Sequence, residues 1–428
     1  MKILCTSQIG STTALGQTMR VTAIAKALQQ RGAQVKFLAG GKLIPVIQSH
    51  GIEIIPLPSM PEIELFPNEG QWDDQDYQRE MGAKIGSCLE LSLQREKEVI
   101  MDESPDLMLC GSPLSILSAR EARIPASLTM LQPHGKKTLE YLLKKMKERT
   151  TLRNMIDASL SRGDFEKSFS EGMETVPLIF LEGMPEISGD IDFNQISGDF
   201  PELGERIQKI KSKIRFTGPL ISESLEKLPN QKELKIRHSG NQDQPLVYVT
   251  IGGGTSLIGE EFLSLAVETF RSLPKVKAVI STGLAVSAER MGNYCPPENV
   301  AIHQFVPGLE LIMASNVTVF HGGSSTLMNC IACGKPGVVV PSMAEQEDNG
   351  RVLSQNGAGI LLDKRGLTPE ILATAIQKTL EDDSFGRQAE KLRMIGEKYG
   401  GAEGAAAILE QFMKERSLAY AGADSGSR

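Results

Sequence analysis

The chain has 428 residues, of which 40% are hydrophobic and 23% charged, and its formal net charge is −7 at pH 7. This length exceeds what a single hydrophobic core organises, so about two domains are expected. The acidic balance argues against a general nucleic-acid-binding protein, so no nucleic acid is expected as a partner. No apolar run approaches the roughly 18 to 20 residues needed to cross a bilayer, so no membrane-spanning helix is predicted.

The N-terminus and the cysteines favour a cytoplasmic location. The chain begins M-K-I-L-C and then turns polar at once, which predicts a first strand and not a signal peptide. The six cysteines are scattered, mostly within apolar segments, as is typical of reduced thiols. Residues 139–152 are basic and partly amphipathic. They predict either an ordinary surface helix or a peripheral contact with the inner face of a membrane.

Short apolar runs alternate with helical patterns along the whole chain. The first series of expected strands covers residues 2–5, 35–38, 107–110, 127–131 and 178–180. Between the first two of these strands, residues 19–31 have apolar side chains at a helical spacing, and Gly32 ends the pattern. The second series covers residues 246–251, 277–281, 300–305, 317–320 and 337–340. Two series of strand–helix units predict an α/β protein with two Rossmann-like, doubly wound domains.

The domain boundaries follow from composition. Residues 226–245 are polar with Pro and Gly, which is typical of a linker. The expected division is a first domain at 1–225, this linker, a second domain at 246–402, a C-terminal helix at 403–418 that returns to the first domain, and a disordered tail at 419–428. Ligands of such sheets bind beyond the carboxyl ends of the strands, so the expected site is the cleft between the domains.

The most informative motif is a turn rich in glycine and hydroxyl groups at residues 321–326, with the sequence H-G-G-S-S-T. It follows a strand-like run and opens a helical run. Glycine lets the backbone approach a phosphate closely, and a helix N-terminus offers free N–H groups and a positive dipole end. The turn therefore predicts a diphosphate site, and the alternative is an ordinary strand–turn–helix junction with a serine N-cap.

Several motifs of the second half, taken together and in order, resemble those of GT-B glycosyltransferases, close to family 1 and to the MurG-like family 28. They are F-T-G-P-L at 216–220, V-Y-V-T-I-G-G at 247–253, N-V at 299–300 with F-V-P at 305–307, the turn at 321–326, G-K-P at 334–336 with Pro341, and E-Q at 345–346 with Asn349. The resemblance implies a GT-B fold, with two Rossmann-like domains facing a cleft. It also implies a hexosyltransferase-type enzyme that moves a sugar from a UDP- or dTDP-linked donor, with inversion, to a hydroxyl or amine of a small-molecule or lipid acceptor. The nucleotide sugar is then a co-substrate, and neither a cofactor nor a metal is expected.

The resemblance assigns the donor to the C-terminal domain. The backbone near Val306 is expected to bind the nucleobase, and Glu345 and Gln346 the sugar hydroxyls. The residues implied near the diphosphate are Gly253, Gly254, Thr255, His321, Gly323, Ser324, Ser325 and Thr326. Asn329 replaces the ribose-binding glutamate of the family, and its amide still hydrogen-bonds a hydroxyl, though less strongly than a carboxylate.

The acceptor base is where the sequence departs from the family. The usual histidine position falls at Gln17, an amide that takes no proton at pH 7 and that would only orient the acceptor. The carboxylate that supports that histidine is also missing, because residues 109–112 are L-C-G-S. His134, after an expected strand, is the candidate base, with a plain loop histidine as the alternative. The other hypotheses are an acceptor that needs no base, a nucleotide-sugar epimerase or hydrolase, and a non-catalytic nucleotide-sugar-binding partner subunit.

Overall fold

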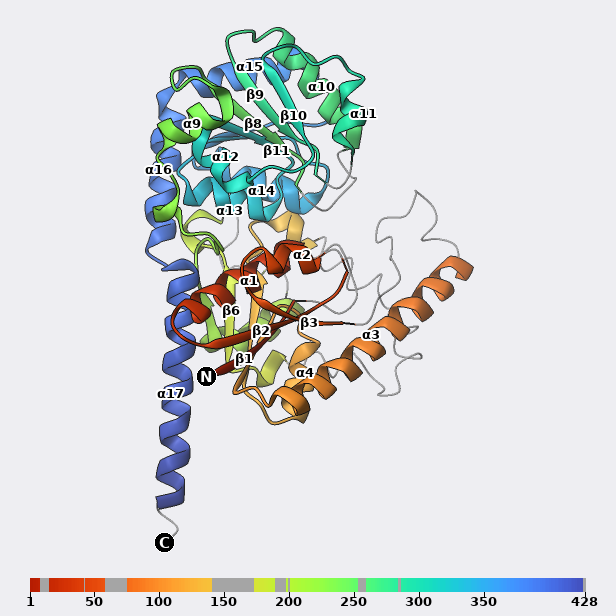
Figure 1. Ribbon diagram of the computed structural model, residues 1–428, viewed down its shortest axis with the longest axis vertical. Coiled ribbons are helices and arrows are strands. Elements are labelled where there is room, and N and C mark those ends of the chain that lie inside the picture. The colour runs from red at the N-terminus through yellow and green to blue at the C-terminus, as the bar shows by residue number, and fades with distance from the viewer. Residues whose placement is uncertain are drawn as a thin grey trace.

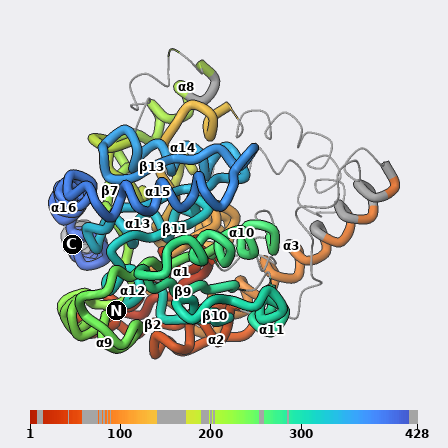
Figure 2. Tube along the Cα trace, turned by 90° about the horizontal axis from the view of Figure 1, so that it is seen from above, coloured from red at the N-terminus to blue at the C-terminus, as the bar shows by residue number. Residues whose placement is uncertain are grey.

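The computed structural model describes residues 1–7, 15–41, 43–57, 75–140, 173–188, 198, 201–252, 259–283 and 286–425. Two α/β domains lie one above the other in Figure 1, and each is built on its own parallel sheet. The predicted pair of doubly wound domains is therefore confirmed. The view from above in Figure 2 shows the helices of the C-terminal domain overlying those of the N-terminal domain.

The N-terminal sheet has the strand order β3-β2-β1-β4-β5-β6-β7, and all its neighbouring strands are parallel. Its strands are β1 (Lys2–Thr6), β2 (Gln34–Ala39), β3 (Glu53–Pro56), β4 (Leu107–Cys110), β5 (Ala126–Leu131), β6 (Leu178–Glu182) and β7 (Ile214–Phe216). Its helices are α1 (Leu15–Gln30), α2 (Leu43–Gln48), α3 (Gln75–Glu103), α4 (Ser115–Glu121) and α8 (Pro201–Ile210), with single 3-10 turns η2 (Pro185–Ile187) and η3 (Lys211–Lys213). The four strands β1, β4, β5 and β6 are buried over most of their length, as expected for a sheet covered on both faces.

The C-terminal sheet repeats this architecture with the order β10-β9-β8-β11-β12-β13. Its strands are β8 (Leu246–Thr250), β9 (Lys277–Ser281), β10 (Val300–His303), β11 (Val317–Phe320), β12 (Gly337–Val339) and β13 (Gly359–Leu361). Its helices are α10 (Gly259–Arg271), α11 (Ala288–Gly292), α12 (Gly308–Ala314), α13 (Ser324–Ala332), α14 (Ala344–Gln355), α15 (Pro369–Glu381) and α16 (Asp383–Glu397). The chain order reverses between β8 and β11, and ligands bind doubly wound sheets at such a reversal.

Two segments differ from the expected linker and tail. The 3-10 turn η4 (Leu225–Lys227) and the helix α9 (Gln231–Ser239) occupy much of the expected linker, 226–245. Asn230 caps α9 by accepting a hydrogen bond from the backbone N–H of Glu233 at 3.1 Å, and Leu234 is buried in the core of the C-terminal domain. The last helix, α17 (Gly401–Ser425), continues into the segment 419–428 that was expected to be disordered. Alanine at 419 and 421 favours a helix there, a preference that polarity alone does not reveal.

Three short strands were not predicted from the sequence. They are β3, β7 and β13, and each lies at an edge of its sheet. An edge strand is buried on fewer sides than a central one, so the continuous apolar run that marks a buried parallel strand is lost. Their pairing comes from the sheet beside them and not from a local pattern.

The chain crosses between the domains twice, and the two crossings touch. Gly218 has φ = 65°, and a Cβ atom there would lie 2.6 Å from the carbonyl oxygen of Gly396. The backbone N–H of Gly401 donates to the carbonyl of Thr217 at 2.9 Å. After this crossing α17 runs along the N-terminal domain in Figure 1 and packs on α1, with Ala405, Ala406 and Leu409 in the N-terminal core. The helix ties the end of the chain to the first domain.

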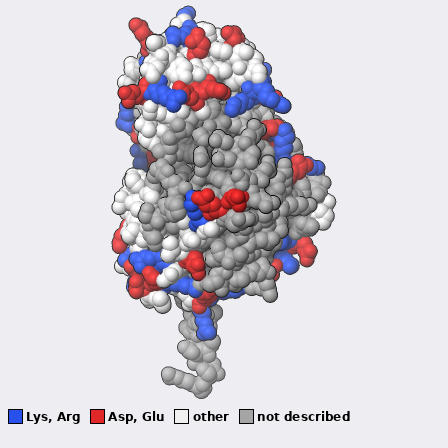
Figure 3. Space-filling view, turned by 90° about the vertical axis from the view of Figure 1, so that its right-hand side faces the viewer, with Lys and Arg blue, Asp and Glu red and all other residues white. Residues whose placement is uncertain are grey.

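The described surface carries both signs of charge. On the face in Figure 3 the basic and acidic residues are intermixed over both domains. Within the described ranges, no helix combines the length and the apolar character needed to cross a membrane. Most of the basic segment 139–152, for which a membrane contact was one hypothesis, lies outside the described residues.

Candidate active site

The glycine turn leads from the carboxyl end of β11 into α13. This end of the C-terminal sheet faces the N-terminal domain. Gly322 has φ = 88°, and a Cβ atom there would lie 2.4 Å from the carbonyl oxygen of Gln346. A residue with a side chain would be strained by the positive φ and would also clash with α14. The turn is therefore pressed against the start of α14. Gly323 is the N-cap, and Ser324, Ser325 and Thr326 form the first turn of α13.

His321 lies beneath this turn. The residue is 8% exposed. A Cβ atom would lie 2.8 Å from Cε1 of its ring if placed on Gly252, and 2.6 Å from Nε2 if placed on Gly323. Burial lowers the pKa of His321 to about 4, against a smaller opposing effect of a hydrogen bond to the Thr250 backbone. The imidazole is thus neutral at pH 7 and supports the two glycine loops. Its direct contact with a diphosphate stays a prediction.

One cavity in the cleft, among the residues that the structure describes, lies against α13. This α13 cavity has a volume of about 360 Å³ and is lined from both domains. The C-terminal domain contributes Tyr248, Thr250, Val306, Ser325, Thr326 and Asn329, and the N-terminal domain contributes Gly16, Arg20 and Glu182 among others. Phe305, 62% exposed, stands at its wall and offers a flat apolar surface. Four of the residues predicted to bind the donor therefore share this cavity, namely Val306, Ser325, Thr326 and Asn329.

Another cavity lies against α14. This α14 cavity has a volume of about 290 Å³ and brings Gln17 and His134 of the N-terminal domain together with Glu345 and Asn349 of the C-terminal domain. The two residues predicted to act on the acceptor thus meet one of the residues predicted to bind the donor sugar. Arg20 lines both cavities, so they are adjacent parts of one cleft.

Gln17 and His134 have distinct surroundings. A Cβ atom on Gly111 would lie 3.0 Å from Cγ of Gln17, so a larger residue at 111 would crowd Gln17. His134 is 2% exposed, and neither ring nitrogen has a hydrogen-bond partner among the described residues. Burial lowers the pKa of His134 to about 4, so the ring is neutral at pH 7. Such a histidine is free to accept a proton, although a pKa this low makes it a weak base.

The start of α14 is tied to the glycine turn. Asn349 donates from Nδ2 to the carbonyl of Gly322 at 2.8 Å, and Oε1 of Gln346 accepts from the backbone N–H of Ser342 at 2.8 Å. Burial raises the pKa of Glu345, while nearby Arg20 and a hydrogen bond with Asn349 act in the opposite direction. Glu345 lines the α14 cavity. The amide oxygen of Gln346, in contrast, already accepts a hydrogen bond from the loop before α14.

Sequence reasoning missed two residues of the cleft. Arg20 lies three positions after Gln17 on α1, on the same helix face, and this spacing was a usable signal. Asp348 lies on α14 and accepts two hydrogen bonds from Thr138 of the other domain, from the backbone N–H at 2.6 Å and from Oγ1 at 2.7 Å. Its role has no local signature, because its partners are about two hundred residues away in the chain.

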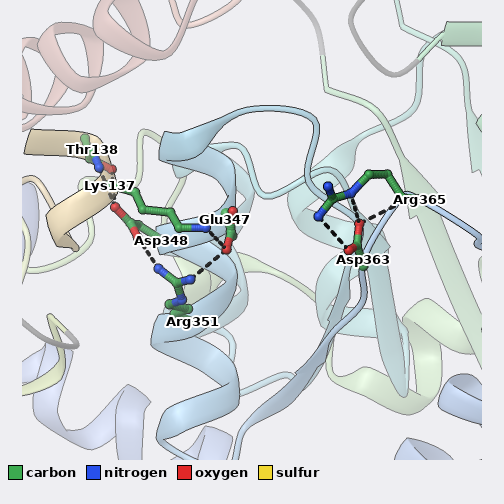
Figure 4. Close-up of polar contacts among 7 residues, drawn as sticks. All are labelled: Lys137, Thr138, Glu347, Asp348, Arg351, Asp363 and Arg365. Carbon is green, nitrogen blue, oxygen red and sulfur yellow. Dashed lines mark hydrogen bonds and ion pairs between the residues drawn. The ribbon is translucent and has the colours of Figure 1, made fainter. Parts of the chain in front are cut away.

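Asp348 belongs to a polar junction between the domains. Figure 4 shows Lys137 and Thr138 of the N-terminal domain reaching Glu347 and Asp348 on α14. Lys137 pairs with Glu347 at 2.5 Å, and Arg351 pairs with Asp348 at 3.0 Å. A Cβ atom on Gly135 would lie 2.2 Å from Cγ of Asp348, so the loop after His134 rests directly on this carboxylate. The junction thereby fixes the His134 loop relative to α14.

Three predicted donor residues, Gly253, Gly254 and Thr255, lie outside the described residues. Within the described ranges, no three or more His, Cys, Asp or Glu side chains are grouped so as to hold a metal ion.

The two parallel sheets, their strand orders and the cleft between them define a GT-B protein with two Rossmann-like domains. The resemblance to family 1-like GT-B glycosyltransferases, carried by motifs between residues 216 and 349, is confirmed by comparison with known proteins.

Residues 274–397 match the family described as erythromycin biosynthesis protein CIII-like, C-terminal domain. NDP-glycosyltransferase YjiC of Bacillus subtilis (strain 168) is 30% identical over 203 residues, which are 47% of this chain and 49% of that protein. The chain thus matches about half the length of this curated relative. The glycotransferase of kitacinnamycin is 18% identical with a TM-score of 0.68, over 96% of this chain and 98% of that one. SsfS6 of Streptomyces sp. SF2575, solved with thymidine diphosphate, is 19% identical with a TM-score of 0.62, over 96% and 99%.

Proposed function

We propose that this protein is a glycosyltransferase that moves a sugar from a UDP- or dTDP-linked donor to a hydroxyl or amine of a small-molecule or lipid acceptor. The observation that carries the proposal is the first turn of α13, where three consecutive hydroxyl residues stand at a helix N-terminus beside a cavity of about 360 Å³. Relatives named as glycosyltransferases and neighbours of the same fold support it.

The proposed chemistry is displacement at the anomeric carbon. The bond from that carbon to the diphosphate oxygen breaks, and its electron pair stays on the oxygen. The acceptor atom bonds to the carbon from the opposite face, which inverts its configuration. A positive helix end and oriented hydroxyl and N–H donors stabilise the negative charge that develops on the leaving diphosphate. The α13 turn supplies such groups from the protein itself, so the reaction is expected to need no metal.

The rest of the donor is expected to extend along the cleft. Phe305 offers a stacking surface for a nucleobase, and Asn329 an amide for a ribose hydroxyl. Glu345 lines the adjoining α14 cavity, where it is expected to accept hydrogen bonds from the sugar. In this arrangement the anomeric carbon lies between the two cavities.

The acceptor proton is expected to pass to His134. The ring is neutral at pH 7 and lines the α14 cavity with Gln17, whose amide would orient the acceptor. Changing His134→Ala is expected to lower turnover at least tenfold while leaving donor affinity intact, as measured by steady-state kinetics and calorimetry. Equal turnover of the variant and the parent would remove His134 as the base.

The test of the function is calorimetric titration with UDP, dTDP and GDP without added metal, followed by a screen of acceptors with the matching nucleotide sugars. Saturable binding of one nucleotide and formation of a glycosylated product are expected. Binding without turnover across a broad panel would instead indicate a non-catalytic partner subunit. Release of free sugar without an acceptor would indicate a hydrolase.

A further inference from the structure

Arg20 is a cation that the N-terminal domain places inside the cleft. It lies on α1, its side chain is 11% exposed, and it lines both the α13 and the α14 cavities. A largely buried arginine needs partners for its charge and its N–H groups. Its ion pair is long, 3.5 Å from Nη1 to Oε2 of Glu182. Its Nε is buried and has no hydrogen-bond partner among the described residues.

Glu182 does not compensate fully for this cation. Its other oxygen, Oε1, already accepts from the backbone N–H of Leu220 at 3.0 Å. Burial raises the pKa of both Glu182 and Glu345, and the charge of Arg20 opposes that rise at each of them. These two carboxyl groups line different cavities. The guanidinium therefore lies between the two cavities, and it has more N–H donors than Glu182 satisfies.

The guanidinium also stands close to the hydroxyls of the α13 turn. The point where Gly16 would carry a Cβ atom is 3.2 Å from Oγ of Ser325, 3.9 Å from Oγ of Ser324 and 3.8 Å from Nη1 of Arg20. Two serine hydroxyls from one domain and a cation from the other thus surround the same small region. Glycine at 16 keeps that region open, since a side chain would fill part of it.

We propose that Arg20 binds the diphosphate of the donor from the N-terminal side, opposite the α13 turn. This inference rests on the proposed function. The planar guanidinium presents a fork of donors that matches phosphate oxygens, and its charge is permanent. As the bond to the anomeric carbon breaks and its electron pair moves to the diphosphate oxygen, Arg20 offsets the added charge. The donor then bridges the two domains, so its binding also holds the cleft together.

The test uses the full-length protein and compares the parent with Arg20→Gln, Arg20→Lys and a control, Arg31→Gln. Arg31 directly follows the same helix but pairs with Glu403 and Glu410 on α17. Calorimetry is expected to show UDP binding weakened at least tenfold in Arg20→Gln, less in Arg20→Lys, and unchanged in Arg31→Gln. Ligand-observed NMR is expected to show equal uridine binding in the parent and Arg20→Gln, because uridine has no phosphate. If the parent prefers dTDP, then dTDP and thymidine replace these probes.

The outcomes separate the two proposals. A parent that binds no nucleoside diphosphate overturns the proposed function and the role of Arg20 with it. A parent that binds UDP while folded Arg20→Gln binds it equally well overturns only the role of Arg20. An equal loss for UDP and uridine would mean that Arg20 only shapes the cavity, and would overturn its role as well. If Arg20→Gln does not fold, Arg20→Lys decides by the same comparison, because lysine keeps the charge but loses the fork.

Discussion

The two cavities of the cleft are built in different ways. The α13 cavity is formed around a continuous strand–turn–helix, in which the glycines, the hydroxyls and the helix end follow one another in the sequence. The α14 cavity exists only where the domains meet, because Gln17 and His134 come from one domain and Glu345 and Asn349 from the other. The hydroxyls proposed to bind the diphosphate thus lie close together in the sequence, whereas the α14 cavity depends on how the domains are docked.

The largest effect is expected from a side chain at the glycine turn. Gly322→Val combines a positive φ with a Cβ position 2.4 Å from the Gln346 carbonyl, so it should lower the free energy of unfolding by roughly 3 to 5 kcal/mol and abolish nucleotide binding. Chemical denaturation measures the free energy of unfolding, and calorimetric titration measures nucleotide binding.

The matched control for that substitution is Gly366→Val. Gly366 also has a positive φ, 75°, but nothing lies within 4 Å of its Cβ position. This variant should lose only about 1 to 2 kcal/mol, from the backbone conformation alone, and should keep nucleotide binding. Equal losses in the two variants would show that contact with α14 is not what makes the turn sensitive.

The pH dependence of stability tests the burial of His134. Its pKa is about 4 in the folded chain and about 6.5 when unfolded, so between these values only the unfolded chain binds the proton. The free energy of unfolding should therefore fall as the pH falls from 6.5 to 4, by about 3 kcal/mol for this group.

Urea unfolding between pH 4 and 7 measures this slope. His134→Gln removes the titrating group and should reduce the loss on acidification, while the matching contribution of His321 in the α13 region persists. Parallel pH profiles of the variant and the parent would contradict a neutral, buried His134.

The junction between the domains should respond to Asp348→Asn. This change removes the charge that Arg351 and Thr138 contact, and leaves a buried amide, so a loss of about 2 to 3 kcal/mol is expected with looser docking of the His134 loop. Chemical denaturation measures the loss of stability, and hydrogen exchange of residues 134–140 measures the docking of the His134 loop.

The control is Asp363→Asn, whose exposed pair with Arg365 stands apart from the junction in Figure 4. Exposed pairs contribute little, so a change within about 0.5 kcal/mol is expected. If Asp348→Asn behaved like this control, the α14 cavity would not depend on the junction.

The smallest effect is expected from the hydroxyls of α13. Ser325→Ala combined with Thr326→Ala should weaken UDP binding by about 1 to 3 kcal/mol, because hydrogen bonds to a charged group are lost while the backbone donors remain. Calorimetric titration measures this affinity, and an unchanged thermal stability of the variant shows that its fold is intact. Unchanged affinity would argue against a diphosphate at this turn.

The sequence by itself determined the central strands, the two-domain fold and the turn at residues 321–326. Each of these depends on neighbours in the chain: apolar runs for buried strands, and glycines and hydroxyls for the helix start. Only the tertiary structure decided the rest of the cleft. The edge strands β3, β7 and β13, the burial that lowers the pKa of His134, and the contact of Asp348 with Thr138 all arise between segments far apart in the chain. Such contacts and the desolvation they cause are set when the domains pack, and no local pattern encodes them.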